Sequence, residues 1–148
     1  MITIQEMNGH ARKLGLVYEV MLSPLSKESG IPHTALSMLL FFANNPDLAT
    51  ARDICELRGL KRAIVSTHVE RLVSEGLIER KAYPGDRRKA FLVCTEKAQP
   101  IIDAGRKAQK EFAGSILDGL SDEELAVMER CFMVMNGNLD KLIKAANI

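Results

Sequence analysis

The stretch LKRAIVSTHVERLVSEGLIERKAYPGDRRKAFLVCT, residues 60–95, decides the fold of this chain. Its first part, residues 61–75, has the periodicity of a helix, because apolar side chains recur at spacings of three and four at Ile64, Val65, Val69 and Leu72. The opposite face carries hydrogen-bond donors and no acid. Gly76 predicts the end of the helix, since glycine adopts the left-handed conformation without strain.

A hairpin with a basic tip is predicted directly after this helix. Residues 77–83 alternate as strand residues do, and residues 90–93 return as a second strand. The turn between them contains Pro84 and Gly85, which tight turns favour, and three basic residues follow at 87–89. A helix followed by such a hairpin is typical of a winged helix. This architecture suits duplex DNA, because the helix can enter a major groove while the wing reaches the neighbouring minor groove.

The length and composition limit the possible class of the protein but do not identify its function. With 148 residues the chain has the length of about one domain and can bury a core without disulfide bonds. The net charge is +1, but residues 50–92 contain ten Lys or Arg and six Asp or Glu, a local net of +4. A solvated charged surface would give an excess of that size as well. The charge alone therefore leaves nucleic-acid binding and an ordinary surface both open.

The cysteines and the ends of the chain point to an intracellular protein. Cys55, Cys94 and Cys131 have neither metal-ligand nor redox spacing, and their apolar neighbours predict buried free thiols. The first residues lack the apolar segment of a signal peptide, and no apolar run approaches transmembrane length. We therefore expect a soluble, cytoplasmic protein that needs no metal or cofactor and does not enter a membrane.

Two shorter helices are predicted before the central one. Residues 34–43 are apolar nearly all round, which favours a buried helix. After a loop, Thr50 is a good N-cap for a helix whose inward residues are predicted to be Ala51, Ile54, Cys55 and Leu57. Arg58 and Gly59 then make the turn into residues 61–75. Two short helices joined by a turn with glycine form a helix-turn-helix.

Three longer helices with narrow apolar seams are predicted at the ends of the chain. Residues 3–26 repeat apolar side chains as heptads, with Pro24 predicting a kink or an end. A long helix follows Thr95, and Ser121 with Glu124 forms a capping box for the last helix. Its heptad residues are Leu125, Met128, Phe132, Met135, Leu139 and Leu142. The predicted central domain is too small to bury these seams. The seams therefore predict a two-fold dimer, and an intramolecular bundle is the alternative.

The sequence thus predicts a mainly α protein with a small β wing. Residues 31–95 would form a winged helix-turn-helix that binds DNA. Residues 1–30 and 96–148 would form a helical dimerisation region.

The phrases TARDICELRGLKRAIVSTHVERLVSEGLIER and PGDRRKAFLVCTEKA, with the helix order, resemble the MarR-type transcriptional regulators over nearly the whole chain. The most specific parts are the helix-turn-helix phrase, the EGLIER junction and the Asp-x-Arg wing followed by Thr-Glu-Lys. The resemblance implies a homodimer with interlocked terminal helices that binds a palindromic operator in double-stranded DNA, usually as a repressor. It also implies that a small, often aromatic or phenolic, anion releases the DNA from many members.

Several positions depart from the family pattern. Lys61 stands where a capping Ser or Thr usually opens the recognition helix, His68 stands at a commonly apolar position, and Ala98 replaces a usual glycine. These departures do not change the expected fold, but they leave the operator sequence unpredicted. The reactive cysteine that peroxide-sensing members carry in the first helix has no counterpart before Cys55.

The predicted DNA-contacting residues fall in two groups. On the recognition helix, small and polar residues allow close approach to a groove and offer donors to bases and phosphates: Lys61, Arg62, Ala63, Ser66, Thr67 and Arg71. In the wing, Arg88 matches the arginine that the family places in the minor groove, and Arg87 and Lys89 are predicted phosphate contacts. Asp86 is placed to hold the turn or to orient Arg88. The alternative for both groups is an ordinary solvent-exposed face.

No ligand-binding residues are assigned from the sequence. Tyr18, His33, Phe41 and Phe42 could line an effector cleft, although core packing is the better interpretation of the two phenylalanines. The chain has no phosphate-binding loop, Gly-x-Ser-x-Gly or His-Glu-x-x-His motif, so no enzyme is expected. The alternative to a DNA-binding regulator is a winged helix that binds another protein, and the basic wing favours DNA.

Overall fold

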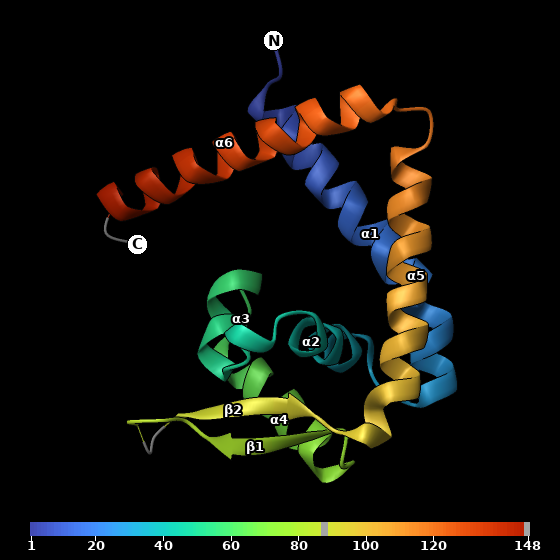
Figure 1. Cartoon of the computed structure of the whole chain (residues 1–148), viewed down its shortest axis with the longest axis vertical. Helices are drawn as coiled ribbons and strands as arrows, with labels where there is room; N and C mark the ends of the chain where they lie inside the picture. Colours follow the sequence, from blue (N-terminus) through green and yellow to red (C-terminus); the bar gives the residue numbers. More distant parts are fainter. Residues whose placement is uncertain (87–88, 147–148) are drawn as a thin grey trace. The chain divides into compact units, whose positions relative to one another are not determined.

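The computed structural model describes residues 1–86 and 89–146, which are helical apart from one two-stranded sheet (Figure 1). The elements, in chain order, are α1 (Ile4–Ser29), α2 (His33–Asn44), α3 (Ala51–Arg58), α4 (Arg62–Ser74), β1 (Ile78–Ala82), β2 (Ala90–Cys94), α5 (Gln99–Leu117) and α6 (Asp122–Ala146). Short 3₁₀ turns, η1 (Pro46–Leu48) and η2 (Glu96–Ala98), precede α3 and α5. This order confirms the predicted fold class.

The chain forms two compact units, Met1–Phe112 and Ala113–Ile148, and the core of the first lies around α2. The buried apolar residues of α2 come from nearly every side of the helix: Ala35, Leu36, Met38, Leu39, Leu40 and Phe42. α2 packs against α1, α4 and β2, which surround it with apolar side chains such as Leu22, Leu72 and Leu92. The prediction of a buried helix is therefore confirmed.

A capping box begins the helix-turn-helix. The Thr50 hydroxyl accepts a hydrogen bond from the Asp53 amide (3.1 Å), and the Asp53 carboxylate accepts one from the Thr50 amide (3.0 Å). Gly59 ends α3 in the left-handed conformation, with φ 60°. These local signals fix both ends of an eight-residue helix.

Three residues predicted to point inward are exposed instead. Leu57 is 58% exposed, Ile64 is 42% exposed, and Ala51 is exposed as well. α3 buries a narrow stripe around Ile54, because so short a helix presents little more than one turn to the core. α4 buries the predicted positions other than Ile64, namely Val65, Val69 and Leu72.

The predicted end of α4 at Gly76 is confirmed. Gly76 has φ 70°, and its amide donates to the Val73 carbonyl at 2.9 Å. The Leu77 amide donates to the Leu72 carbonyl, also at 2.9 Å. These two bonds are the Schellman motif, and they turn the chain directly from α4 into β1.

The wing is an antiparallel hairpin that is fixed through the middle of β2. β1 and β2 pair from Ile78↔Cys94 to Ala82↔Ala90. The Leu92 amide donates to the Ala49 carbonyl at 2.7 Å, which joins β2 to the residues before α3. The hairpin therefore starts from a set position beside the helix-turn-helix (Figure 1).

α1 and α5 complete the first unit. α1 passes through the exposed Pro24 and continues to Ser29, so the proline does not end the helix; Gly30 does, with φ 68°. The Gln109 side-chain amide donates to the Tyr18 hydroxyl at 2.6 Å, which joins α5 to α1. An Arg106 guanidinium bond to the Ala43 carbonyl (2.8 Å) joins α5 to α2.

The second unit is mainly α6. Ser121 and Glu124 form the predicted capping box, with bonds of 2.9 and 3.2 Å between each side chain and the other's amide. No described residue of α6 is buried, and its heptad seam is open to solvent. Phe132 is 56% exposed and Leu139 is 53% exposed. Among the described residues of the second unit, none covers Phe132 or Leu139 of this seam.

The cysteines differ in their environments. Cys94 is half-buried with its thiol 3.8 Å from the Leu39 carbonyl, and burial raises the pKa of that thiol while the positive Arg106 opposes the shift. Cys55 is half-buried as well. Cys131 is exposed on α6, so the prediction of a buried thiol is wrong there, because the apolar residues around it are themselves uncovered.

Candidate nucleic-acid interface

The N-terminal half of α4 presents a polar surface. Lys61 is the N-cap and makes no side-chain cap bond, which agrees with its poor capping chemistry. Arg62, Ala63, Ser66 and Thr67 are all exposed, while the inward face of the same turns holds the buried side chains of α4. The structure thus brings together five of the predicted residues on one solvent-facing surface.

The hydroxyls of this surface differ in how they are held. Thr67 Oγ1 donates to the Ala63 carbonyl at 3.0 Å, which leaves its oxygen lone pairs available as acceptors. Ala63 is small, so it allows a base edge or phosphate to come close to the helix. Ser66 is exposed one position before Thr67 and lines the groove between α4 and the wing.

A groove with a volume of about 500 Å³ lies between α3, α4 and the wing. Its lining residues include four basic side chains and no acidic one: Arg52, Arg62, Arg80 and Lys89. The remaining lining residues are small, apolar or hydroxyl-bearing, such as Ala51, Thr50 and Leu92. A concave surface with this charge suits an anionic polymer better than a neutral partner.

Two of the groove's basic residues are held by ion pairs. Arg52 Nε bonds Glu56 at 2.6 Å, and Arg80 Nη2 bonds Glu70 at 2.5 Å, which links β1 to α4. Within residues 1–86 and 89–146, by contrast, no ion pair involves Lys61 or Arg62. An external anion therefore displaces no described carboxylate when it meets either side chain.

The wing near its tip is ordered by ring and backbone contacts. Tyr83 stacks on Phe91 with 4.7 Å between ring centroids, and the Lys89 ammonium lies 5.3 Å from the Tyr83 centroid. The backbone of Asp86 closes the turn, since its amide donates to Tyr83 (3.3 Å) and its carbonyl accepts from Lys89 (3.1 Å). The predicted contacts Arg87 and Arg88 lie outside the described residues, so the orienting role of Asp86 stays a prediction.

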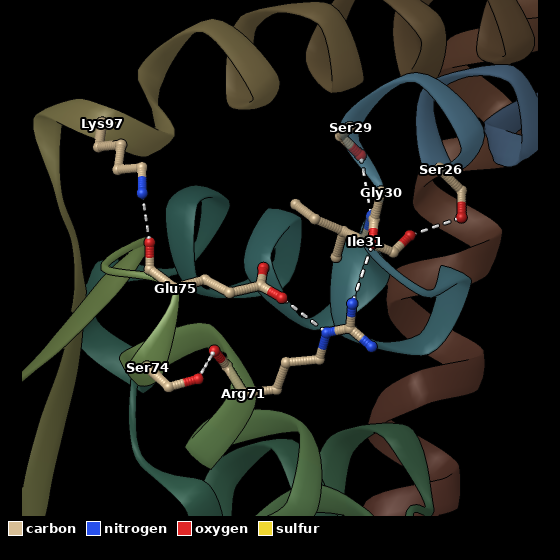
Figure 2. Close-up of polar contacts among 8 residues, drawn as sticks. All are labelled: Ser26, Ser29, Gly30, Ile31, Arg71, Ser74, Glu75 and Lys97. Carbon is tan, nitrogen blue, oxygen red and sulfur yellow. Dashed lines mark hydrogen bonds and ion pairs between the residues drawn. The ribbon is translucent and has the colours of Figure 1, made fainter.

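Arg71 does not lie with the other predicted residues. It is on the last turns of α4, and its guanidinium donates to the Gly30 carbonyl (3.0 Å) and to the Glu75 carboxylate (2.8 Å) (Figure 2). Two of its five donors are therefore used inside the chain, while the side chain stays 42% exposed.

The residues considered for an effector cleft lie among the packed helices of the first unit. Phe42 is buried and Phe41 is half-buried against the core, as core packing predicts. Tyr18 and His33 meet edge to face with 6.5 Å between centroids, and His33 Nε2 is buried without a hydrogen-bond partner. In the part of the chain that the structure describes, no cluster of three or more His, Cys, Asp or Glu could hold a metal ion.

Arg52 and Arg80 were not predicted as part of this surface. They come from α3 and β1, and only the folded chain places them beside α4. Neither residue has a local sequence signal of its own, although the EGLIER phrase contains Arg80.

Among the described helices, none combines the length and the apolar character that a membrane span requires.

Comparisons with known proteins agree with this geometry. Residues 29–89 match the model of the MarR family. The chain is 22% identical, over 77% of its length and 69% of the relative's, to YdgJ of Bacillus subtilis, an uncharacterized HTH-type transcriptional regulator. Its fold is similar to that of a protein from Listeria monocytogenes described as of the MarR family and crystallised with 26mer DNA (TM-score 0.76, 17% identity, covering 97% of this chain and 93% of that one). It is also similar to a MarR transcriptional regulator from Methanosarcina mazei Go1 (TM-score 0.76, 16% identity, 93% and 99% covered).

Proposed function

We propose that this chain is a MarR-type winged helix-turn-helix protein and acts as a cytoplasmic transcriptional regulator that binds a specific DNA sequence. The observation that carries the proposal is the exposed N-terminal surface of α4, where Lys61 and Arg62 take part in no ion pair among the described residues and lie beside a basic groove. Cations of this kind neutralise phosphates, and the hydroxyls of Ser66 and Thr67 offer donors and acceptors to base edges. The role is one of binding, not of catalysis.

The proposed active form is a homodimer on a palindromic operator. α6 exposes its apolar heptad seam, and α1 exposes apolar residues such as Ile4 and Leu14. A second copy would bury both. Two-fold symmetry would then place two α4 helices at half-sites about one turn of DNA apart, roughly 34 Å. Residues 1–30 and 96–148 are the proposed dimerisation region, and residues 31–95 the DNA-binding region.

We propose that the protein acts as a repressor, released from its operator by a small aromatic or anionic effector. Both statements rest on its resemblance to the MarR-type regulators. Footprinting on genomic DNA with and without aromatic acids tests them together, because protection that overlaps a promoter and is lost with the acid is the expected result.

Selection from a random-sequence duplex library tests the binding itself. The wild-type protein should enrich a palindrome, and the salt dependence of binding to it should change in Arg62→Ala. Each lost phosphate contact lowers the slope of log K against log salt by about 0.9, so a dimer should lose about 1.8. Between 50 and 200 mM salt, a slope difference of about 1.8 corresponds to roughly a twelvefold change in relative affinity.

Lys107→Ala is the matched control, because Lys107 is an exposed cation on α5 outside the groove. Its slope should equal that of the wild type. A wild-type protein that enriches no sequence would contradict the proposal. A winged helix that binds another protein would then be the better interpretation.

A further inference from the structure

The C-terminal turn of α4 is the point where three segments of the first unit meet (Figure 2). Arg71 Nη2 donates to the Gly30 carbonyl at the end of α1 (3.0 Å). Lys97 Nζ donates to the Glu75 carbonyl (2.7 Å), and the Thr95 hydroxyl donates to the Gly76 carbonyl (2.7 Å). The end of α4 is therefore held by the last residues of α1 and by the residues that lead into α5.

Arg71 is the member of this cluster that reaches α1. Its Nε donates to the Glu75 carboxylate at 2.8 Å. Glu75 therefore orients the guanidinium plane of Arg71, from which Nη2 donates to the Gly30 carbonyl. A guanidinium supplies both donors at a fixed angle, which a lysine ammonium does not. The Gly30 carbonyl is a favourable acceptor, because the C-terminus of a helix carries partial negative charge.

The acceptor side of this contact is ordered as well. Gly30 takes the left-handed conformation, which ends α1 sharply. The Ser29 hydroxyl donates to the Leu25 carbonyl (2.7 Å), and the Ser26 hydroxyl donates to the Ile31 carbonyl (2.6 Å). These bonds fix the peptides on both sides of Gly30, and Figure 2 shows the Gly30 carbonyl directed at the Arg71 guanidinium.

We propose that Arg71 is a positioning residue that fixes the orientation of α4 against α1, and that it does not contact DNA. This inference rests on the proposed function, because the orientation of α4 matters if two copies of it must enter successive major grooves. α1 belongs to the proposed dimerisation region. The Arg71–Gly30 bond therefore transmits the geometry of the dimer to the helix that reads the operator.

Binding measurements separate a positioning residue from a phosphate contact. The probes are the duplex that the wild-type protein selects and a scrambled duplex of equal composition. Arg71→Ala should lower affinity for the selected duplex about tenfold, or about 1.4 kcal/mol. Its affinity for the scrambled duplex and its salt slope should stay as in the wild type. Glu75→Gln, which keeps the bond to Gly30, should lose less than Arg71→Ala.

An equal loss on both duplexes with a slope flattened by about 1.8 would assign Arg71 to a phosphate and overturn the proposal. Wild-type affinity of Arg71→Ala for the selected duplex would overturn it too. Circular dichroism and a melting curve establish that Arg71→Ala is folded before its affinities are compared with those of the wild type.

Hydrogen exchange without DNA tests the contact independently. In Arg71→Ala, amides of residues 26–36 should exchange faster than in the wild type, because the Gly30 peptide loses its partner on α4. Lys107→Ala, which removes an exposed lysine elsewhere, should leave them unchanged. Unchanged exchange in Arg71→Ala would refute the role of Arg71, whereas a wild-type protein that selects no DNA would refute the proposed function. The two failures are therefore distinguishable.

Discussion

Gly105 of α5 lies directly against the Leu40 side chain of α2. A Cβ atom at Gly105 would lie 2.4 and 2.8 Å from the two methyl carbons of Leu40 and 3.1 Å from its Cγ. Leu40 is completely buried, so its side chain has no open space to enter. Gly105→Ala should therefore force either a rotamer change in the core or a separation of α5 from α2.

Two effects of opposite sign decide how far Gly105→Ala changes the free energy of unfolding. Alanine in place of glycine within a helix stabilises by about 1 kcal/mol, and overpacking a core costs about 1–3 kcal/mol. We expect Gly105→Ala to lower the free energy of unfolding by roughly 0–2 kcal/mol. Gly114→Ala is the matched control on the same helix, because nothing lies within 4 Å of its Cβ position. It should stabilise by up to about 1 kcal/mol.

Thermal melting at one protein concentration measures the difference between the two variants. A gap of about 1–3 kcal/mol corresponds to roughly 2–12 °C for a chain of this length. Leu40→Val removes part of the obstruction, so Gly105→Ala should be less harmful in that background, with favourable coupling in a double-mutant cycle. If Gly105→Ala stabilises the wild-type background as much as Gly114→Ala does, the close approach of α5 and α2 does not constrain the fold.

Three further outcomes follow from the exposed surfaces. Ser66→Ala and Thr67→Ala should change which sequences are enriched from a library, since a good base contact supplies about 1–3 kcal/mol of discrimination; unchanged relative affinities would show that neither residue reads bases. Leu139→Glu should give monomers or aggregates in sedimentation and abolish operator binding, because it places an unpaired charge in the seam of α6, and a wild-type monomer at micromolar concentration would contradict the seam's role. At pH 8, Cys94 should react with a thiol reagent more slowly than Cys131, because burial keeps the Cys94 thiol protonated, and faster labelling of Cys94 would show that this burial is transient.

Most of the fold could be predicted from local sequence signals. The end of α4 at Gly76 and the capping box of Ser121 and Glu124 were predicted from the sequence and are present with good geometry. Each depends on residues within a few positions of one another, so their chemistry does not require knowledge of the rest of the fold. The heptad seams were visible for the same reason, because periodicity is a property of one helix.

Contacts between distant residues could not be predicted in this way. Arg71 has the exposure and charge of a DNA contact when its helix is considered alone. Its distant acceptor within the chain, the Gly30 carbonyl, is 41 residues away and is a backbone group without a sequence signature. Ile64 was assigned to the core from its spacing, but the stripe that α2 and the wing cover is narrower than the apolar stripe of α4.

The pairing of the acids explains how a chain with a net charge of +1 presents a basic surface. Within residues 50–92, five acids have partners of their own inside that stretch. Asp53 caps α3 through Thr50, and the other four pair with Arg or Lys: Glu56 with Arg52, Glu70 with Arg80, Glu75 with Arg71 and Glu79 with Lys81.

These pairs fix side chains that support the helix-turn-helix and the wing. Lys61 and Arg62, at the start of α4, are left outside the described ion pairs. The excess charge is thus concentrated where α4 would meet a phosphate backbone, although the bulk charge of the protein is close to zero. Exchanging an arginine that is paired with a carboxylate, such as Arg52, should consequently change the salt dependence of binding less than exchanging Arg62 does.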